Sequence, residues 1–494
     1  MVKSTLNYGI MMRILGWVLA IESAFMVPAL LIALKARDLV VVNAFFIAML
    51  IALGVSLVFW LVSRNAEKGF YAKEGLVCTG LAWVALSLIG ALPFCLAGRI
   101  PNYIDALFEI VSGFTTTGAS VVSDVEALGK GLLYWRSFSH WVGGMGVLVF
   151  FLAIVPAAGK NDGYMVHLLR AESPGPSVTK MVPRMRDTAV ILYTLYVALT
   201  LLDILFLLIG KMPLFDAICI AFGTAGTGGF AVLNSGLSTY TPFAQYVTTV
   251  FMLLFGINFS LYYIITMRRF KAAFGDQELN LYFSIVLISI LMIAINVFRA
   301  TPETGELEPT VRHSAFQVAS IITTTGYSTV DFNLWPTFSK SILLVLMFCG
   351  ACAGSTGGGI KVVRVLLLLK SIRRNAHQIF HPHEVRIIRM NGQRVAEQTV
   401  TNVNGYLAAY VVIVILSFLI LSADRVNYSL TTNFSAVMAT FNNIGPGFDA
   451  VGATGNFSGY SAFSKLIMCL DMLLGRLEIF PILAMFAPST YFRA

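Results

Sequence analysis

Residues 112–120 read SGFTTTGAS, and three later stretches repeat their pattern of an apolar run leading into a Gly/Thr/Asn-rich turn. These stretches are 222–230 (FGTAGTGGF), 321–328 (IITTTGYS) and 440–448 (TFNNIGPGF). Glycine tolerates positive φ, so a loop of this kind can turn consecutive carbonyl oxygens toward one axis. Four such loops on a common axis would form a ring that replaces the water shell of a cation. The repeated stretch therefore predicts a pore.

Each loop has a candidate central glycine for this filter. It is Gly118 in the first loop, Gly326 in the third and Gly445 in the fourth, whereas Gly228 and Gly229 both remain candidates in the second. The predicted filter set is Thr116, Thr117, Gly118, Thr227, Gly228, Gly229, Thr324, Thr325, Gly326, Asn443, Ile444 and Gly445. For a single loop, a glycine that merely breaks a helix or eases packing is the alternative. Four recurrences, each after a short helix, favour the pore.

The composition indicates an integral membrane protein. Of 494 residues, 57% are hydrophobic and 12% are charged, whereas soluble domains carry about 25% charge. A span needs about 20 apolar residues, which gives about ten candidates. They are residues 14–34, 39–62, 76–97, 133–155, 189–209, 246–266, 281–297, 342–369, 403–421 and 462–486. A signal peptide is the alternative for the first, but its length favours a retained helix.

Segments too short to cross the bilayer precede the four loops. They cover residues 103–114, 214–222, 312–322 and 430–441, which is the length of a re-entrant pore helix. The predicted fold is all-α, with about ten transmembrane helices and four pore helices. Four pseudo-symmetric helix–pore loop–helix repeats surround one pore. An N-terminal helix pair (1–74) precedes repeats 75–187, 188–278, 279–400 and 401–494.

The net charge of +9 is concentrated in a few inter-helix segments. Those segments hold Arg64, Lys68, Lys73, Lys160, Arg170, Lys180, Arg184, Arg186, Arg268, Arg269, Lys271, Arg364, Lys370, Arg373, Arg374, Arg386, Arg389 and Arg394. Such asymmetry follows the positive-inside rule and predicts that these segments are cytoplasmic, with both termini on that side. This placement argues against nucleic-acid binding, and it predicts that the chain interacts with a lipid bilayer.

Residues 338–372 are too long for one span, and their middle is rich in glycine. Each helix-interior glycine costs about 1 kcal/mol, so we expect the segment around Gly350–Gly359 to be unwound or mobile. A phosphate-binding loop is a rival, but Lys361 lacks the following Ser or Thr. A glycine-packed helix crossing is the other alternative. Arg476, inside the last span, should face water or a partner such as Glu109.

Three further groups admit two interpretations each. Cys349 and Cys352 have a redox or zinc spacing, but all six cysteines fit better as buried apolar residues. The acids after the filter turns, Asp124, Glu126, Asp331 and Asp449, would either gather cations or be solvated loop acids. A cytoplasmic cluster of His377, His381, His383 and Glu384 would either bind a metal or form a solvated polar loop.

At these residues the chain resembles the Trk/Ktr/HKT superfamily of cation translocators, most closely its TrkH-type potassium-translocating subunits. The most specific matches are TTTGYSTVDFNLWP (323–336), GACAGSTGGGIKV (350–362), NNIGPGF (442–448) and MLLGRLEIFP (472–481). The resemblance covers nearly the whole chain and has the same four-repeat fold. Glycine in all four loops is associated there with potassium, whereas serine in the first is associated with sodium transport in some plant relatives.

The resemblance implies potassium transport through a prokaryotic inner membrane by a multi-pass, non-enzymatic protein, with potassium at the filter carbonyls and no cofactor in this chain. It also implies a homodimer and a cytosolic ring of TrkA-like nucleotide-binding regulatory subunits. The gate it suggests is an intramembrane loop with a pore arginine. In this chain the corresponding residues are Gly350, Gly354, Ser355, Thr356, Gly357, Gly358, Gly359, Lys361 and Arg476.

Two other functions stay open. A symporter coupling potassium to protons or sodium would need carboxylates inside spans, for which Glu22, Asp203 and Asp471 are the main candidates. A membrane receptor or scaffold that works through its cytoplasmic loops would leave the four filter-like turns unexplained.

Overall fold

The computed structural model describes residues 6–65, 72–146, 185–300, 306–384 and 386–487. Lys68, Lys160, Arg170, Lys180 and Arg184, both chain ends and the last part of the predicted span 133–155 lie outside these residues. In the described part the helices are joined by loops, and the strands form one two-stranded hairpin, β1 (Arg389–Met390) and β2 (Gln393–Arg394). The predicted all-α membrane fold is confirmed.

The first half of the chain begins with a helix pair, α1 (Tyr8–Lys35) and α2 (Leu39–Val62). It continues with α3 (Ala72–Gly90), α4 (Leu92–Leu96), α5 (Tyr103–Phe114), η1 (Glu126–Leu128), α6 (Lys130–Gly144), α9 (Met185–Ile209), α10 (Leu214–Gly226), α11 (Pro242–Phe255), α12 (Phe259–Thr266) and α13 (Phe270–Phe274). The second half holds α14 (Gln277–Ala300), α15 (Leu307–Ile322), η2 (Phe332–Leu334), α16 (Thr337–Phe348), α17 (Val362–Phe380), α18 (Glu397–Ser422), α19 (Leu430–Phe441), η3 (Asp449–Val451), α20 (Ala462–Arg476) and α21 (Phe480–Phe486).

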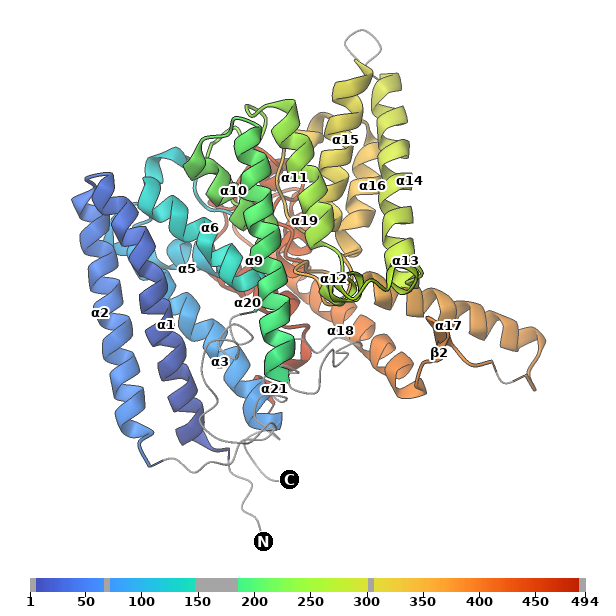
Figure 1. The fold of residues 1–494 in the computed structure, drawn as a ribbon, viewed down its shortest axis with the longest axis horizontal. Coiled ribbons are helices and arrows are strands. Elements are labelled where there is room, and N and C mark those ends of the chain that lie inside the picture. Colours follow the sequence, from blue (N-terminus) through green and yellow to red (C-terminus); the bar gives the residue numbers. More distant parts are fainter. Residues whose placement is uncertain (1–5, 66–71, 147–184, 301–305, 385, 488–494) are drawn as a thin grey trace.

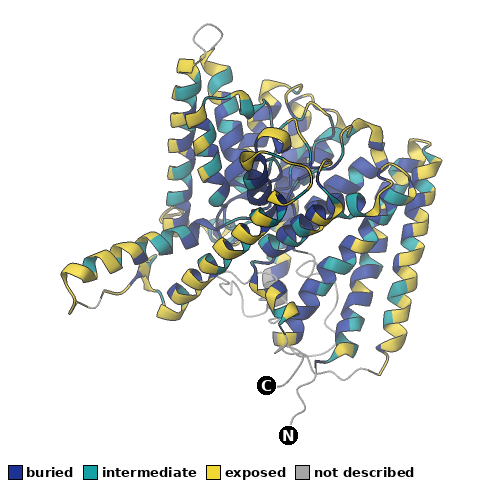
Figure 2. Cartoon of the chain, turned by 180° about the vertical axis from the view of Figure 1, so that it is seen from behind, coloured by how far each residue is buried: buried dark blue, intermediate teal, exposed yellow. Residues whose placement is uncertain are grey.

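The distribution of side chains is that of a protein solvated by lipid. Large apolar side chains such as Phe46, Leu50 and Leu57 are exposed on α2, and the outer faces of α1 and α2 are the exposed ones in Figure 2. Polar side chains such as Thr116 and Asn443 are instead fully buried. Six described helices are long and apolar enough to cross a membrane, and the bent pair α11–α12 adds a seventh.

Three of the predicted spans are interrupted. The span predicted at 246–266 is bent by 90° between α11 and α12, because α11 ends at the Gly256 cap and Asn258 caps α12 through the N–H of Ser260. The span at 342–369 is broken between α16 and α17, which confirms the predicted unwinding. The span at 462–486 is broken between α20 and α21, where Glu478 and Ile479 have positive φ.

The four predicted pore helices are present as α5, α10, α15 and α19. The bounds of α5 and α19 agree with the prediction, α10 extends four residues further, to Gly226, and α15 begins five residues earlier, at Leu307. Each pore helix packs against a helix of the preceding repeat: α10 on α6, α15 on α11, α19 on α16 and, closing the circle, α5 on α20. This order places the four loops around a common centre.

Candidate ion pathway

The four loops share one backbone conformation. Each has a left-handed residue one or two positions after its pore helix, namely Thr116, Thr227, Thr324 and Asn443, with φ between 54° and 58°. Two positions later each has a glycine with positive φ: Gly118, Gly229, Gly326 and Gly445. The equivalent glycine of the second loop is therefore Gly229, and Gly228 precedes it. Positive φ is costly for residues other than glycine, which explains the recurrence of Gly here.

The loops close into a ring. A Cβ built on Gly118 would lie 2.0 Å from the carbonyl oxygen of Gly228, and one on Gly229 would lie 1.9 Å from that of Thr325. A Cβ on Gly326 would lie 2.1 Å from the carbonyl oxygen of Ile444. The circle is completed by Gly445, whose Cβ would lie 2.8 Å from the carbonyl oxygen of Thr117. Each glycine therefore abuts the carbonyl that precedes the glycine of the next loop.

Each loop is also fixed to its own pore helix by an equivalent hydrogen bond. In each loop one backbone N–H donates to the carbonyl five residues earlier, at a donor–acceptor distance of 2.8 Å. The donors are Thr117, Gly228, Thr325 and Ile444. Because all four pore helices end at the ring, their partial negative charges converge there. The ring is therefore a place that favours a cation.

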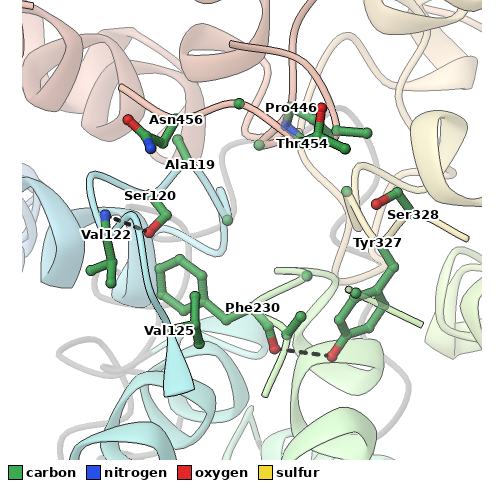
Figure 3. Close-up of a pocket in the computed structure, with 18 of the residues that line it drawn as sticks. Ala119, Ser120, Val122, Val125, Phe230, Tyr327, Ser328, Pro446, Thr454 and Asn456 are labelled. Carbon is green, nitrogen blue, oxygen red and sulfur yellow. Dashed lines mark hydrogen bonds between the residues drawn. The ribbon is translucent and has the colours of Figure 1, made fainter. Parts of the chain in front are cut away.

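A cavity of about 280 Å³ lies directly above the ring, and all four ring glycines line it. Figure 3 shows its wall, with side chains from all four repeats facing one space. The Tyr327 hydroxyl donates to the carbonyl of Ile220 at 3.0 Å and to that of Phe230 at 3.5 Å, which ties the third loop to the second repeat. We call this cavity, which all four ring glycines line, the vestibule.

A buried ion pair supports the first loop. Arg136 on α6 contacts Glu109 on α5 at 2.7 Å, and both side chains are almost fully buried. The Glu109 carboxylate also accepts hydrogen bonds from the Ser120 hydroxyl and the Val121 N–H. The Arg136 guanidinium lies 3.9 Å from the centre of the Phe230 ring. Glu109 thus pairs with Arg136, so the alternative in which Glu109 is the partner of Arg476 is wrong.

His140 links the first two loops. Its Nδ1 lies 2.8 Å from the Gly113 carbonyl, and its Nε2 accepts from the Phe230 N–H at 3.3 Å. An imidazole that donates through one nitrogen and accepts through the other is neutral. Sequence reasoning missed both His140 and Arg136. The signal for Arg136 was present, because an arginine inside an apolar span is costly unless paired, the argument already applied to Arg476.

The non-helical segment 349–361, which we call the glycine segment, lies against the inner side of the ring. The Gly358 N–H donates to the Thr324 hydroxyl at 2.7 Å. A Cβ on Gly358 would lie 2.6 Å from the Asn442 carbonyl, and one on Gly357 would lie 3.1 Å from the Thr323 carbonyl. Of the predicted gate glycines, Gly354 and Gly359 have positive φ.

Arg476 joins the glycine segment to the ring. Its guanidinium donates to the Thr116 hydroxyl at 3.1 Å and to the Thr356 carbonyl at 2.8 Å. It also donates to the carbonyls of Gly143 and Gly144 at the end of α6, both at 2.5 Å. The side chain is therefore held between the first loop and the glycine segment, on the side of the ring away from the vestibule.

Glu278 anchors the glycine segment to α14, and further charged side chains lie within the segment and just after it. The Glu278 carboxylate on α14 accepts from the N–H groups of Ala353 and Val363, at 2.6 and 3.1 Å. Lys361 donates to the Gly357 carbonyl within the segment, and Arg364 pairs with Glu478 below Arg476. The Ser355 hydroxyl donates to the Cys352 carbonyl at 2.6 Å and so shapes the turn locally.

The remaining predicted groups have these positions. All six cysteines are free thiols, and Cys349 and Cys352 lie in the glycine segment. Asp124 accepts from the Asn234 side chain, and the Glu126 carboxylate accepts from the Asn234 N–H, so both link the first and second repeats. Asp331 caps η2, and the Asp449 carboxylate accepts from the Ser429 hydroxyl. All four acids have structural contacts, and none of them lines the vestibule.

Comparison with known proteins shows which family this chain resembles. The family model TrkH, described as a cation transport protein, matches residues 41–493. The chain is 34% identical over 482 residues to the Trk system potassium uptake protein TrkH of Salmonella typhimurium, covering 97% of this chain and 98% of that protein. It is 32% identical over 490 residues to the Trk system potassium uptake protein TrkG of Escherichia coli K12, covering 98% of this chain and 99% of that protein.

A solved structure agrees with these sequence matches. The crystal structure of the potassium transporter TrkH from Vibrio parahaemolyticus superposes with a TM-score of 0.87 at 31% identity. The match covers 98% of this chain and 100% of that one. The arrangement of helices described above is therefore shared with a solved transporter over nearly its whole length.

Proposed function

This chain belongs to the TrkH family of cation transport proteins, and we propose that it carries potassium ions across the inner membrane of a prokaryotic cell. The observation that carries the proposal is the closed ring of four loops, in which every key position is a glycine packed against the carbonyl of the next loop. The names of its relatives as potassium uptake proteins support the choice of ion.

In this proposal the ring is the selectivity filter. A potassium ion leaves its water shell in the vestibule and binds backbone carbonyls of the predicted filter set, with Gly229 as the key glycine of the second loop. The converging ends of α5, α10, α15 and α19 stabilise the cation electrostatically. No cofactor and no catalytic step are needed, because the protein only replaces the hydration shell.

The glycine segment and Arg476 form the gate. The segment covers the inner side of the ring, and Arg476 holds it there through the Thr356 carbonyl while contacting Thr116 of the filter loop. Ions pass when these contacts break and the segment withdraws. The positive charge of Arg476 also opposes a cation on the axis until the side chain moves away.

In this proposal, partner proteins control the opening of the gate. We place cytosolic nucleotide-binding regulatory subunits against the basic cytoplasmic surface that includes Arg373, Arg386, Arg389 and Arg394, all of which are exposed. The helix that carries the start of this surface, α17, follows directly on the glycine segment and projects from the bundle (Figure 1). A homodimer with one pore in each protomer completes the proposed assembly.

A coupled potassium symporter is the second candidate, and buried acids favour it. Glu22 on α1 and Asp203 on α9 are buried, and neither carboxylate has a hydrogen-bond partner among the described residues. Such groups are candidate proton sites by default. However, Asp471 accepts from the Ser417 hydroxyl on α18, and among the described residues none of these three acids forms a hydrogen bond with the ring. We therefore rank symport second.

Rubidium uptake into liposomes carrying the purified chain tests the proposal. We expect uptake that potassium blocks strongly and sodium blocks weakly. The same assay on Arg476→Ala separates a closed gate from a missing pore, and absence of flux in both proteins would favour a receptor or scaffold. A reversal potential that shifts with a pH gradient at fixed potassium would favour the symporter.

A further inference from the structure

Three metal-ligand side chains meet at the end of α17. His377 and His381 lie one helical turn apart, and the chain turns back at Pro382 to bring in Glu384. One potential ligand atom from each of the three lies within 4.8 Å of the others. The two imidazole rings are stacked with centroids 4.5 Å apart, and the Glu384 Oε2 lies 3.7 Å from the His377 Nδ1.

The position of the His377 Nδ1 is the second observation. This atom is buried and has no hydrogen-bond partner, although the His377 side chain is 26% exposed as a whole. Its 3.7 Å separation from the Glu384 carboxylate exceeds a hydrogen bond. A buried nitrogen lone pair or N–H without a partner is unfavourable. A metal ion placed between the imidazoles and the carboxylate would satisfy it.

The charges around the cluster allow a cation to bind. Arg374, the nearest basic residue along α17, is paired with Glu397 at 2.7 Å. Arg373 and Arg386 are exposed, so water and salt screen them. The cluster also lies at the C-terminal end of α17, where the last carbonyls carry partial negative charge.

We propose that His377, His381 and Glu384 form a binding site for a divalent transition-metal ion of the Zn²⁺ type. Two imidazoles with one carboxylate suit Zn²⁺, whereas Ca²⁺ and Mg²⁺ prefer oxygen ligands. Three protein ligands leave the fourth tetrahedral position to water or to another donor. A bound ion would tie the last turn of α17 to the chain that leads into the β1–β2 hairpin.

Helix α17 projects from the bundle and its end is exposed in Figures 1 and 2, so the ligands can be changed without disturbing the fold. The test is a titration of the full chain in detergent, purified with a histidine-free tag, using Zn²⁺ alone against a fluorescent chelator. We expect one Zn²⁺ per chain. His377→Ala with His381→Ala should weaken binding at least about ten-fold, the lower end of the loss when even outer-shell partners are removed.

Two matched variants complete the test. Glu384→Gln keeps the size of the side chain but removes its charge, and it should also weaken binding. His383→Ala removes a histidine of the same turn that lies outside the three-residue cluster, and it should bind Zn²⁺ as the unaltered chain does. Equal Zn²⁺ affinity in all four proteins, or equal loss in the His383→Ala variant, would overturn the proposal. The measurement involves no ion flux, so its failure would leave the transport proposal untouched.

Discussion

The ring and the glycine segment beneath it are both rich in glycine, but they are held in different ways. Each loop of the ring forms a backbone hydrogen bond of 2.8 Å to its own pore helix and abuts the next loop. The glycine segment is bonded to other elements by side chains, through Arg476 on α20, Thr324 in the third loop and Glu278 on α14. Backbone bonds also join it to α11 and α12, from the Cys352 N–H to the Gly256 carbonyl and from the Phe259 N–H to the Gly354 carbonyl, both at 3.0 Å. Every loop of the ring is thus fixed to its own pore helix, whereas the segment is held from several neighbouring elements.

In the proposed mechanism this difference separates a rigid filter from a movable gate. A filter must keep its geometry while ions pass, and four interlocked loops resist distortion because each blocks its neighbour. A gate must have two arrangements of similar free energy. The bonds that Arg476 and Glu278 make to the segment are the ones that single substitutions can remove, and each such bond to a charged group contributes only about 1.5–3 kcal/mol.

The largest effect is expected from Gly229→Ala. Its Cβ would lie 1.9 Å from the Thr325 carbonyl oxygen at a φ of 74°. The left-handed conformation alone costs about 1–2 kcal/mol, so potassium preference over sodium should fall at least about ten-fold. Competition of rubidium uptake by the two ions measures this.

Two matched glycines calibrate the result. Gly445→Ala places its Cβ 2.8 Å from the Thr117 carbonyl oxygen and should lose less preference than Gly229→Ala. Gly405 on α18 has nothing within 4 Å of its Cβ position, so Gly405→Ala should leave the preference unchanged. Equal behaviour of the Gly229 and Gly405 variants would refute the interlocked ring. Gly118→Ser should likewise lower the preference, because its Cβ would lie 2.0 Å from the Gly228 carbonyl.

Arg476→Ala comes next, and it acts on the segment instead of the ring. It removes the bonds to Thr116, Thr356, Gly143 and Gly144 together. We expect rubidium uptake to rise several-fold while the ion preference is kept. Arg476→Lys should give a smaller rise, since an ammonium retains the charge but lacks the planar fork of donors. An unchanged or lower rate in Arg476→Ala would mean that the residue does not hold a gate.

A smaller effect is expected from Glu278→Gln. The amide oxygen can still accept from the N–H groups of Ala353 and Val363, but the acceptor is then neutral and the hydrogen bonds are weaker. The loss of about 1 kcal/mol should raise uptake by up to roughly five-fold. Exposed Glu306, at the cap of α15, provides the control in Glu306→Gln. A rise in both variants would point to surface charge and not to anchoring of the segment.

The smallest effect concerns the outer mouth. The hydrogen bond from Asn234 lowers the pKa of Asp124, so its charge is present at and above the usual range for aspartate and is lost only as pH falls through the lowered pKa. Asp124→Asn should reduce uptake less than about two-fold, and only at low ionic strength, because salt screens such fields. Asn234→Ala breaks the same link without removing the charge. If it has the larger effect, the acid is structural.

The sequence predicted the elements that depend on local signals. Helix α5 is capped by Asn102 and ends at a Thr-rich turn, and helix α19 is capped by Ser429 and ends at an Asn-rich turn. The bounds of both helices could therefore be derived from residues close to them in the chain. The earlier start of α15 was missed because residues 307–311, LEPTV, lack an apolar pattern. Choosing Gly229 over Gly228 required the backbone conformation, because only Gly229 has the positive φ that the key glycines of the other loops share.

Contacts between distant residues were beyond sequence reasoning. The partners Glu109 and Arg136 are 27 residues apart, and Arg476 meets Thr116 from 360 residues away. The first pair forms when α6 packs on α5 within one repeat, whereas the second forms only when the fourth repeat closes on the first. The cost of an intramembrane arginine indicates that a partner exists, but it does not say which one.

The most direct test of the four-loop filter is to locate the ion. Crystals of the chain grown in rubidium, measured by anomalous diffraction, should show a peak on the axis between the carbonyls that surround Gly118, Gly229, Gly326 and Gly445. The peak should weaken when potassium replaces rubidium and should be displaced or lost in Gly229→Ala. A ring without a peak, with rubidium bound instead beside Glu22 or Asp203, would contradict the account and support coupled transport.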